Sequence, residues 1–322
     1  MFSVRAEEDS LLWDFMLESY SPFESAGGGD ERFCLTLVDS LAHMDGELVY
    51  SDEGNADEGF PSFSIFEGPE GRLYEITQPG SDKLNARLLV IRPSLQGSVD
   101  ADNLPSLQGR AGRGDGMRAF LMLDGSDSQR WFSFTSAMNI CYILATSAYS
   151  TVLTHSSSVI YKGWAYIFLG KSGTGKSTHS RMWGKALDGV VLMNDDHPVL
   201  RVEDDGTVMA YGSPWSGKTH CYKKLSAPLG GIIRISRAPY NKATRQAGVQ
   251  AYASLMASCS SIVWDADLAD GRHGCLEAII AKVPSYVMEC LPDEDAARVC
   301  CAAVRRDGPL EGANKDPREG AL

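Results

Sequence analysis

The chain has 322 residues and a mass of 34.9 kDa, which is enough for one large domain or two modest ones with a substantial core. Its 42 Asp and Glu residues outnumber its 30 Lys and Arg residues, so the formal net charge is −12. An acidic surface without a basic block argues against a partner bound through nucleic-acid phosphates. We therefore expect no nucleic-acid partner.

The N-terminal sequence and the cysteines indicate the compartment. The chain begins without a basic segment followed by an apolar one, and no apolar run approaches the roughly 18 residues of a membrane helix. We therefore expect a cytoplasmic protein without a membrane partner. The 8 cysteines are scattered, without C-x-x-C pairs, which predicts reduced, buried thiols rather than a zinc site.

Residues 1–125 are expected to form a smaller, β-rich N-terminal region of unknown role. Short apolar or alternating runs recur there between turns, a cadence typical of antiparallel strands. These runs are residues 33–38, 47–50, 62–66, 72–76, 86–91 and 119–123. A short amphipathic stretch at residues 11–16 precedes them, and residues 93–117, rich in Gly, Ser and Asp, predict an exposed loop.

Residues 126–306 are expected to form a second domain, followed by a disordered tail over residues 307–322. A buried helix is predicted over residues 130–149, near the boundary between the two domains. We expect strands at 151–154, 158–161, 189–193, 199–202, 207–211, 227–237 and 285–289, and helices at 177–187, at 244–256 and from 292 to about 306.

A phosphate-binding loop follows an apolar run that begins at Ala165. The loop matches the pattern G-x-x-x-x-G-K-[ST], and a strand before it and a helix after it are both predicted. Its small residues let backbone N–H groups turn toward an anion, and the positive end of the helix adds attraction. Lys176 is expected to reach the β- and γ-phosphates of a nucleotide, and Ser177 to ligate Mg²⁺. The expected nucleotide-binding residues are Gly170, Ser172, Gly173, Thr174, Gly175, Lys176, Ser177 and Thr178.

Two adjacent carboxylates, Asp195 and Asp196, close the strand predicted after this loop. At such a position one carboxylate can hold Mg²⁺ while the other accepts a proton from an attacking hydroxyl. Aspartates also commonly cap turns. The phosphate loop upstream favours the functional interpretation.

Three basic residues further along the chain are candidates for contact with phosphate. Lys218 lies in the glycine-bracketed segment 212–219, which is either a loop that closes over phosphates or a surface turn. Arg234 and Arg237 end a predicted strand. Each can contact nucleotide or substrate phosphate, or be ion-paired on the acidic surface.

With these residues in place, the chain from about His155 to Arg306 resembles the catalytic domain of HPr kinase/phosphorylase. That family belongs to a wider group that shares the nucleotide fold of ATP-dependent phosphoenolpyruvate carboxykinase. It places a histidine, the phosphate loop and a carboxylate pair in the order found here, at similar intervals. The resemblance implies an α/β fold in which a P-loop kinase domain with a mixed sheet follows the β-rich N-terminal region.

The resemblance also implies roles for individual residues. Lys176 and the loop amides would bind the phosphates of ATP, and Ser177 and Asp196 would ligate Mg²⁺. Asp195 would be the general base toward a hydroxyl, and His155 beside it would tune its proton affinity. Related kinases are often oligomeric, so a homo-oligomer is consistent with the resemblance.

The sequence also departs from this family. The N-terminal region does not resemble the family's N-terminal domain, and segment 212–219 differs from the motif that follows the kinase core, so the acceptor need not be HPr. A phosphoenolpyruvate carboxykinase activity is not expected, because such enzymes are much longer and need further metal- and carboxylate-binding residues that we cannot place here.

The leading hypothesis is an ATP-dependent phosphotransferase acting on a hydroxyl of a protein serine or a small molecule. Whether it also runs the family's reverse phosphorolysis is left open by the sequence. The alternative is a nucleotide-dependent switch or scaffold. Because a pure binder has no use for a base, the intact Asp195–Asp196 pair favours the kinase.

Overall fold

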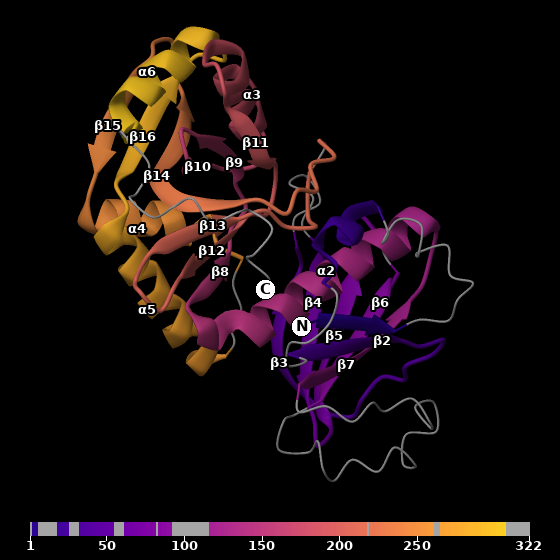
Figure 1. Cartoon of the computed structure of the whole chain (residues 1–322). Helices are drawn as coiled ribbons and strands as arrows, with labels where there is room; N and C mark the ends of the chain where they lie inside the picture. The colour runs from indigo at the N-terminus through magenta and orange to yellow at the C-terminus, as the bar shows by residue number, and fades with distance from the viewer. Residues whose placement is uncertain are drawn as a thin grey trace. The chain divides into compact units, whose positions relative to one another are not determined.

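The computed structural model describes residues 2–5, 18–25, 32–54, 61–81, 83–91, 116–217, 219–260 and 265–306. These residues form a mixed α/β protein with two mixed sheets, and their contacts divide it into two compact units (Figure 1). Unit 1 takes its described residues from 1–18 and 26–145, and unit 2 from 19–25 and 146–322. The predicted segment 11–16, most of the predicted loop 93–117, and the tail 307–322 lie outside the described residues.

Unit 1 is built on a seven-stranded sheet with the order β1-β2-β7-β6-β5-β4-β3. Its strands are β1 (Phe2–Arg5), β2 (Phe33–Leu37), β3 (Glu47–Asp52), β4 (Ser62–Glu67), β5 (Gly71–Thr77), β6 (Ala86–Ile91) and β7 (Met117–Leu123). The β-rich prediction is confirmed, but a purely antiparallel sheet is wrong, because β2 pairs parallel to β1 and to β7. The meander from β3 to β6 separates β2 from β7 in the chain, and such a long connection permits parallel pairing.

Helix α2 (Asp127–Thr146) belongs almost entirely to unit 1. Figure 1 shows it lying along the seven-stranded sheet, and Phe134, Ala137 and Cys141 on it are 0 % exposed. The other sheet face packs against the segment after β2, where Val38 and Leu41 join a buried cluster. Because the helix buries its apolar side here, the division falls after Ala145, later than the expected break at residue 125.

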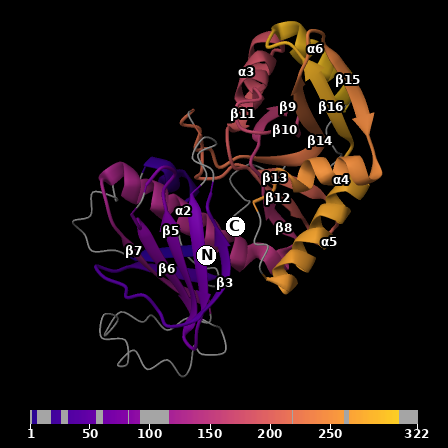
Figure 2. The same ribbon diagram turned by 180° about the vertical axis from the view of Figure 1, so that it is seen from behind.

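Unit 2 contains a nine-stranded mixed sheet that forks at its longest strand. Its strands are β8 (Thr151–Leu153), β9 (Ser157–Tyr161), β10 (Trp164–Leu169), β11 (Val191–Asn194), β12 (Val199–Val202), β13 (Val208–Tyr211), β14 (Ser226–Arg237), β15 (Lys242–Gln246) and β16 (Ser285–Cys290). The start of β14 pairs with β13 and its later part pairs with β16. Strands β10, β11, β14 and β16 run in the same direction, so their carboxyl ends share one edge (Figure 2).

Two pairs of helices cover opposite faces of this sheet. Helices α3 (Lys176–Ala186) and α6 (Glu294–Val304) pack side by side over one face, around the buried ring of Trp183. Helices α4 (Gly248–Met256) and α5 (Ala266–Lys282) cover the other face. Asp293 caps α6 by accepting a hydrogen bond from the N–H of Ala296. Glu294 and Asp295 occupy its first turn, where acidic residues suit the positive end of the helix.

Several predicted elements differ from the structure in detail. The helix predicted over 244–256 is partly wrong, because residues 242–246 form β15 and pair with β16, and the helix begins only at Gly248. Helix α5 and strand β1 were not predicted. All 8 cysteines are buried and free, as expected. Within the described ranges, no helix has the length and apolar character needed to cross a membrane.

Candidate active site at the phosphate loop

The glycine loop between β10 and α3 adopts a left-handed backbone at two of its glycines. Gly173 and Gly175 have φ values of 75° and 111°, a left-handed backbone region that favours glycine, and an added Cβ at either would meet nothing within 4 Å. Thr174 closes the turn, since its N–H and its hydroxyl both donate to the carbonyl of Lys171. The strand and helix predicted on either side of the loop are confirmed.

Lys176 lies at the first position of α3 and is only 8 % exposed. Its ammonium donates to the carbonyl of Gly170 at 2.9 Å, so the side chain folds back across its own loop. Burial lowers the pKa of this ammonium, while the nearby Asp196 and Asp195 act in the opposite direction. The Lys176 Nζ also lies 3.4 Å from the Nε2 of His155.

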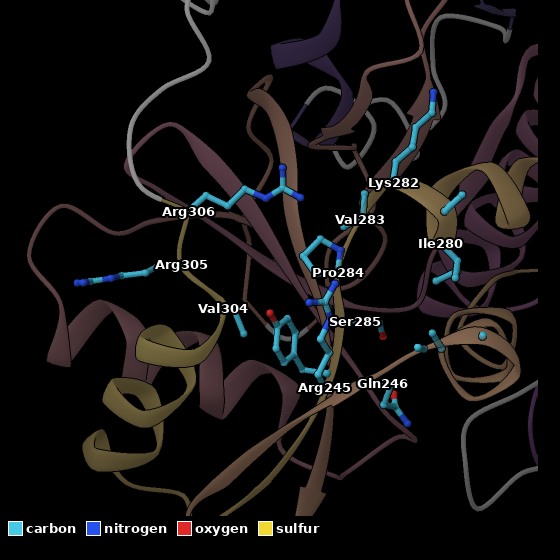
Figure 3. A pocket seen from close by; sticks show the side chains of 15 residues that line it. Arg245, Gln246, Ile280, Lys282, Val283, Pro284, Ser285, Val304, Arg305 and Arg306 are labelled. Atoms are coloured by element: carbon cyan, nitrogen blue, oxygen red, sulfur yellow. The ribbon is translucent and has the colours of Figure 1, made fainter.

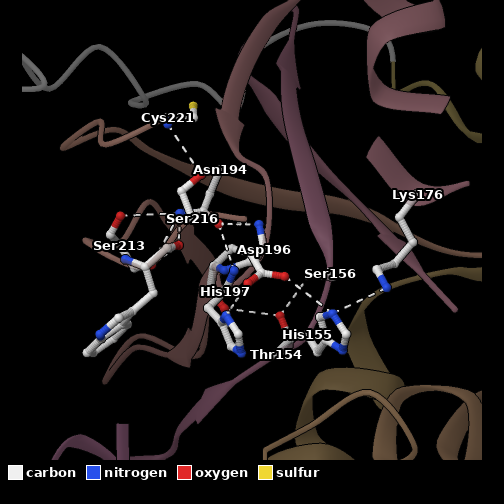
Figure 4. A network of polar contacts seen from close by, with 12 residues as sticks. Thr154, His155, Ser156, Lys176, Asn194, Asp196, His197, Ser213, Ser216 and Cys221 are labelled. Atoms are coloured by element: carbon white, nitrogen blue, oxygen red, sulfur yellow. Dashed lines mark hydrogen bonds and ion pairs between the residues drawn. The ribbon is translucent and has the colours of Figure 1, made fainter. Parts of the chain in front are cut away.

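Asp196 is held between two imidazoles, as Figure 4 shows. Its Oδ1 lies 3.3 Å from the Nε2 of His155, and its Oδ2 lies 3.0 Å from the Nδ1 of His197. The two rings stack with centroids 5.6 Å apart. Burial by itself would raise the pKa of the Asp196 carboxyl, but hydrogen bonds from His155 and His197 outweigh it and hold that pKa well below its usual range. This carboxyl is therefore ionised at neutral pH.

Asp195 is only 5 % exposed, and its carboxylate has a different partner from that of Asp196. Its Oδ1 accepts a hydrogen bond from the Ser157 hydroxyl at 2.9 Å. Ser157 Oγ in turn lies 2.6 Å from the Oγ of Ser180, in the first turns of α3. Asp195 is thus connected to the helix that begins with Lys176 and Ser177. Asp196 instead contacts His155, whose Nε2 also lies 3.4 Å from the Lys176 ammonium.

The completely buried amide of Asn194 fixes the turn that carries both carboxylates. Its Oδ1 accepts from the backbone N–H groups of Asp196 and His197, at 2.9 and 2.8 Å. Its Nδ2 donates to the carbonyls of Ser213 and Trp215, at 3.2 and 3.0 Å. One side chain thereby ties the end of β11 to the 212–219 segment. In that segment Gly217 lies close to Asp196, since an added Cβ would be 3.5 Å from its Cγ.

The predicted basic residues have different places around the loop. The Arg237 side chain, at the end of β14, donates to the carbonyl of Gly173. Arg234 is exposed on β14 and pairs in register with Leu169, the last residue of β10. Lys218 lies outside the described residues.

The structure brings together His155, Lys176 and Asp196 from three separate segments. Asn194, His197 and Ser157 were not predicted as part of the site. The first two flank the aspartates in the run Asn194-Asp195-Asp196-His197, and that adjacency was the available signal. Nothing in the sequence marked Ser157 as a site residue, because a serine in an apolar strand is ordinarily a buried hydroxyl that is hydrogen-bonded within the core.

Comparisons with known proteins do not add to this geometry. No model of a protein family matches the chain, and no curated protein matches it.

Proposed function

We propose that unit 2 is an ATP-dependent phosphotransferase of the HPr kinase type that transfers the γ-phosphate to a hydroxyl of a protein serine or a small molecule. The observation that carries this proposal is the convergence of Lys176, His155 and Asp196 beside an open phosphate loop. A binding loop alone would serve any nucleotide-dependent protein. An ionised carboxylate linked through His155 to the lysine that would reach the γ-phosphate has a specific use in moving a hydroxyl proton.

The fit of the nucleotide is supported by the loop itself. The left-handed Gly173 and Gly175 would let the loop turn its N–H groups toward phosphate oxygens, and the N-terminus of α3 would provide further N–H donors. Lys176 would exchange its bond to the Gly170 carbonyl for the phosphates, and Arg237 would add positive charge next to Gly173. The chemistry that Mg²⁺ supplies when bound is neutralisation of charge on the phosphate oxygens.

The geometry favours exchanging the roles that the family resemblance implied for Asp195 and Asp196. Asp195 is linked through Ser157 to α3, the helix that carries Ser177, so this carboxylate belongs with Ser177 on the metal side. Asp196 is linked through the Nε2 of His155 to the Lys176 ammonium, which marks the γ-phosphate end. We therefore assign Asp196 to orient the acceptor hydroxyl and take its proton, and His155 and His197 to orient that carboxylate. Positioning and charge neutralisation supply most of the rate acceleration in such reactions.

The test is phosphoryl transfer from γ-labelled ATP with Mg²⁺, using wild type, Asp195→Asn, Asp196→Asn and the matched control Asp188→Asn. Asp188 is exposed beyond the end of α3 and also loses one carboxylate charge. The acceptors are a cell extract, purified HPr-like protein and free hydroxyl compounds including serine. We expect transfer to one acceptor by wild type and by the control, and a fall of about 10²-fold or more in Asp196→Asn with ATP binding retained. Asp195→Asn should mainly raise the Mg²⁺ concentration needed for half-maximal rate.

Two outcomes would count against these assignments. If all four proteins bind ATP and none transfers label, the chain is a nucleotide-dependent switch or scaffold. If Asp195→Asn loses transfer with an unchanged Mg²⁺ requirement and Asp196→Asn retains it, Asp195 is the base.

A further inference from the structure

A cavity lies in unit 2, away from the phosphate loop. Its volume is about 340 Å³, and it is bounded by the end of β15, the start of α4, the ends of α5 and α6, and the start of β16 (Figure 3). Strand β16 runs from Ser285 at this cavity to Cys290, which pairs with Arg237 at the phosphate-loop edge. The five intervening residue steps correspond to roughly 17 Å, so the cavity is separate from the proposed active site.

The cavity has an unbalanced positive charge. Its lining includes Arg245, Lys282, Arg305 and Arg306, and it includes no Asp or Glu. Figure 3 shows Arg245 pointing toward Pro284 and Ser285, while Arg305 points outward. Lys282 is engaged with the carbonyl of Gly206, and the Arg306 guanidinium lies over the Trp164 ring. Within the described part of the chain, Arg245 has no carboxylate partner, although the net charge of the whole chain is −12.

The start of α4 adds a second feature suited to an anion. The helix begins at Gly248 without a side-chain cap and without an acidic residue in its first turn. Ala247, Gly248 and Ala251 all line the cavity. The N–H groups of a first helical turn have no partner within the helix and carry partial positive charge, so they favour a negatively charged ligand.

An orphaned hydroxyl provides a third and independent feature. Ser285 lines the cavity and is 2 % exposed, and its Oγ has no hydrogen-bond partner among the described residues. A buried hydroxyl without a partner is costly, which indicates that a ligand or an ordered water satisfies it.

We propose that this cavity binds a phosphorylated small molecule. Its phosphate would be held by the first-turn N–H groups of α4, by Arg245 and by the Ser285 hydroxyl. The cavity volume suits a compact metabolite, and the Tyr286 ring and Val304 offer apolar contact to the rest of the ligand. The inference uses no property of the phosphate loop, so it does not rest on the proposed kinase activity.

The experiment measures binding of inorganic pyrophosphate by calorimetry at constant ionic strength. The full chain carries Lys176→Ala in every sample, so that the phosphate loop contributes little. Arg245→Gln is compared with Lys242→Gln, a neutralisation of the same size on the same strand at a residue outside the cavity lining. We expect Arg245→Gln to weaken binding about ten-fold or more, because charge-assisted hydrogen bonds of this kind contribute about that factor. Lys242→Gln should change the affinity less than two-fold, and Ser285→Ala should weaken it by a smaller factor than Arg245→Gln.

Three outcomes would overturn the proposal. They are no pyrophosphate binding in the Lys176→Ala chain, equal affinity with and without Arg245, and equal loss in the Arg245 and Lys242 variants. A second variant tests the acidic residues that follow Arg306, by changing Asp307, Glu311, Asp316 and Glu319 to amides in the full chain. If pyrophosphate binds only in that variant, the cavity serves the chain's own acidic segment and not a separate ligand.

Discussion

Replacing Asn194 with alanine tests how the carboxylate turn is positioned. Asn194 is 0 % exposed, and it is the acceptor for two backbone N–H groups and a donor to the carbonyls of Ser213 and Trp215. Alanine leaves the N–H groups of Asp196 and His197 without their acceptor. Since each buried, unsatisfied donor costs about 1–3 kcal/mol and two are left, we expect the free energy of unfolding to fall by roughly 2–6 kcal/mol. At about 2–4 °C per kcal/mol for a unit of this size, Tm should decrease by at least roughly 4 °C.

The same substitution should affect the chemistry separately from stability. Without the Asn194 bonds, Asp196 is no longer held in place beside His155 and the 212–219 segment. If unit 2 has the proposed phosphotransferase activity, transfer should fall strongly while ATP affinity is retained, because misplacement by about 1 Å commonly costs on the order of 10²-fold.

The measurements are thermal unfolding, ATP affinity and transfer rate, with Asn85→Ala as the matched control. Asn85 is also buried, at 2 % exposed, and accepts the N–H of Gln78 at 2.9 Å, but it belongs to unit 1. The control should lower stability and leave ATP affinity and transfer unchanged. If Asn194→Ala unfolds at the wild-type temperature, or if both variants lose transfer equally, the positioning role of Asn194 is refuted.

Two further predictions concern stability. Burial lowers the pKa of His179 to about 4 from 6.5, so its neutral ring is favoured in the folded state and the free energy of unfolding should fall by roughly 3 kcal/mol as the pH drops from 6.5 toward 4. Denaturant unfolding across this range should show a flatter slope in His179→Gln, and identical slopes would contradict the assignment. The indole N–H of Trp215 donates to the Tyr20 hydroxyl at 2.9 Å, which ties residues 19–25 to the rest of unit 2. A double-mutant cycle of Tyr20→Phe and Trp215→Phe should give a coupling of about 1 kcal/mol, whereas additive effects would show that this bond is not stabilising.

Many helices and strands could be predicted because the residue patterns that specify them are short and continuous in the sequence. Alternating apolar runs predicted six of the seven strands in unit 1, and the Asp-Glu-Asp run after Pro292 predicted the start of α6. Elements with weak local signals were missed. Helix α5 contains Gly271 and Gly274, which lower helix propensity, and its place over the sheet is secured by packing of Leu276 and Ile279. Residues 242–246 form a strand only because β16, about forty residues later, provides an edge with which to pair.

The sequence by itself predicted the glycine loop, its strand and helix, and the two carboxylates downstream, because each depends on residue types at short spacing. It could not show which groups each carboxylate contacts. Those contacts depend on β11 lying beside β9, which brings Ser157 to Asp195 and His155 to Asp196. Only the tertiary structure also shows the buried Asn194 amide and the cationic cavity at the far end of β16, since their partners come from distant segments of the chain. Long-range pairing and burial decide such contacts, and neither is visible in local spacing.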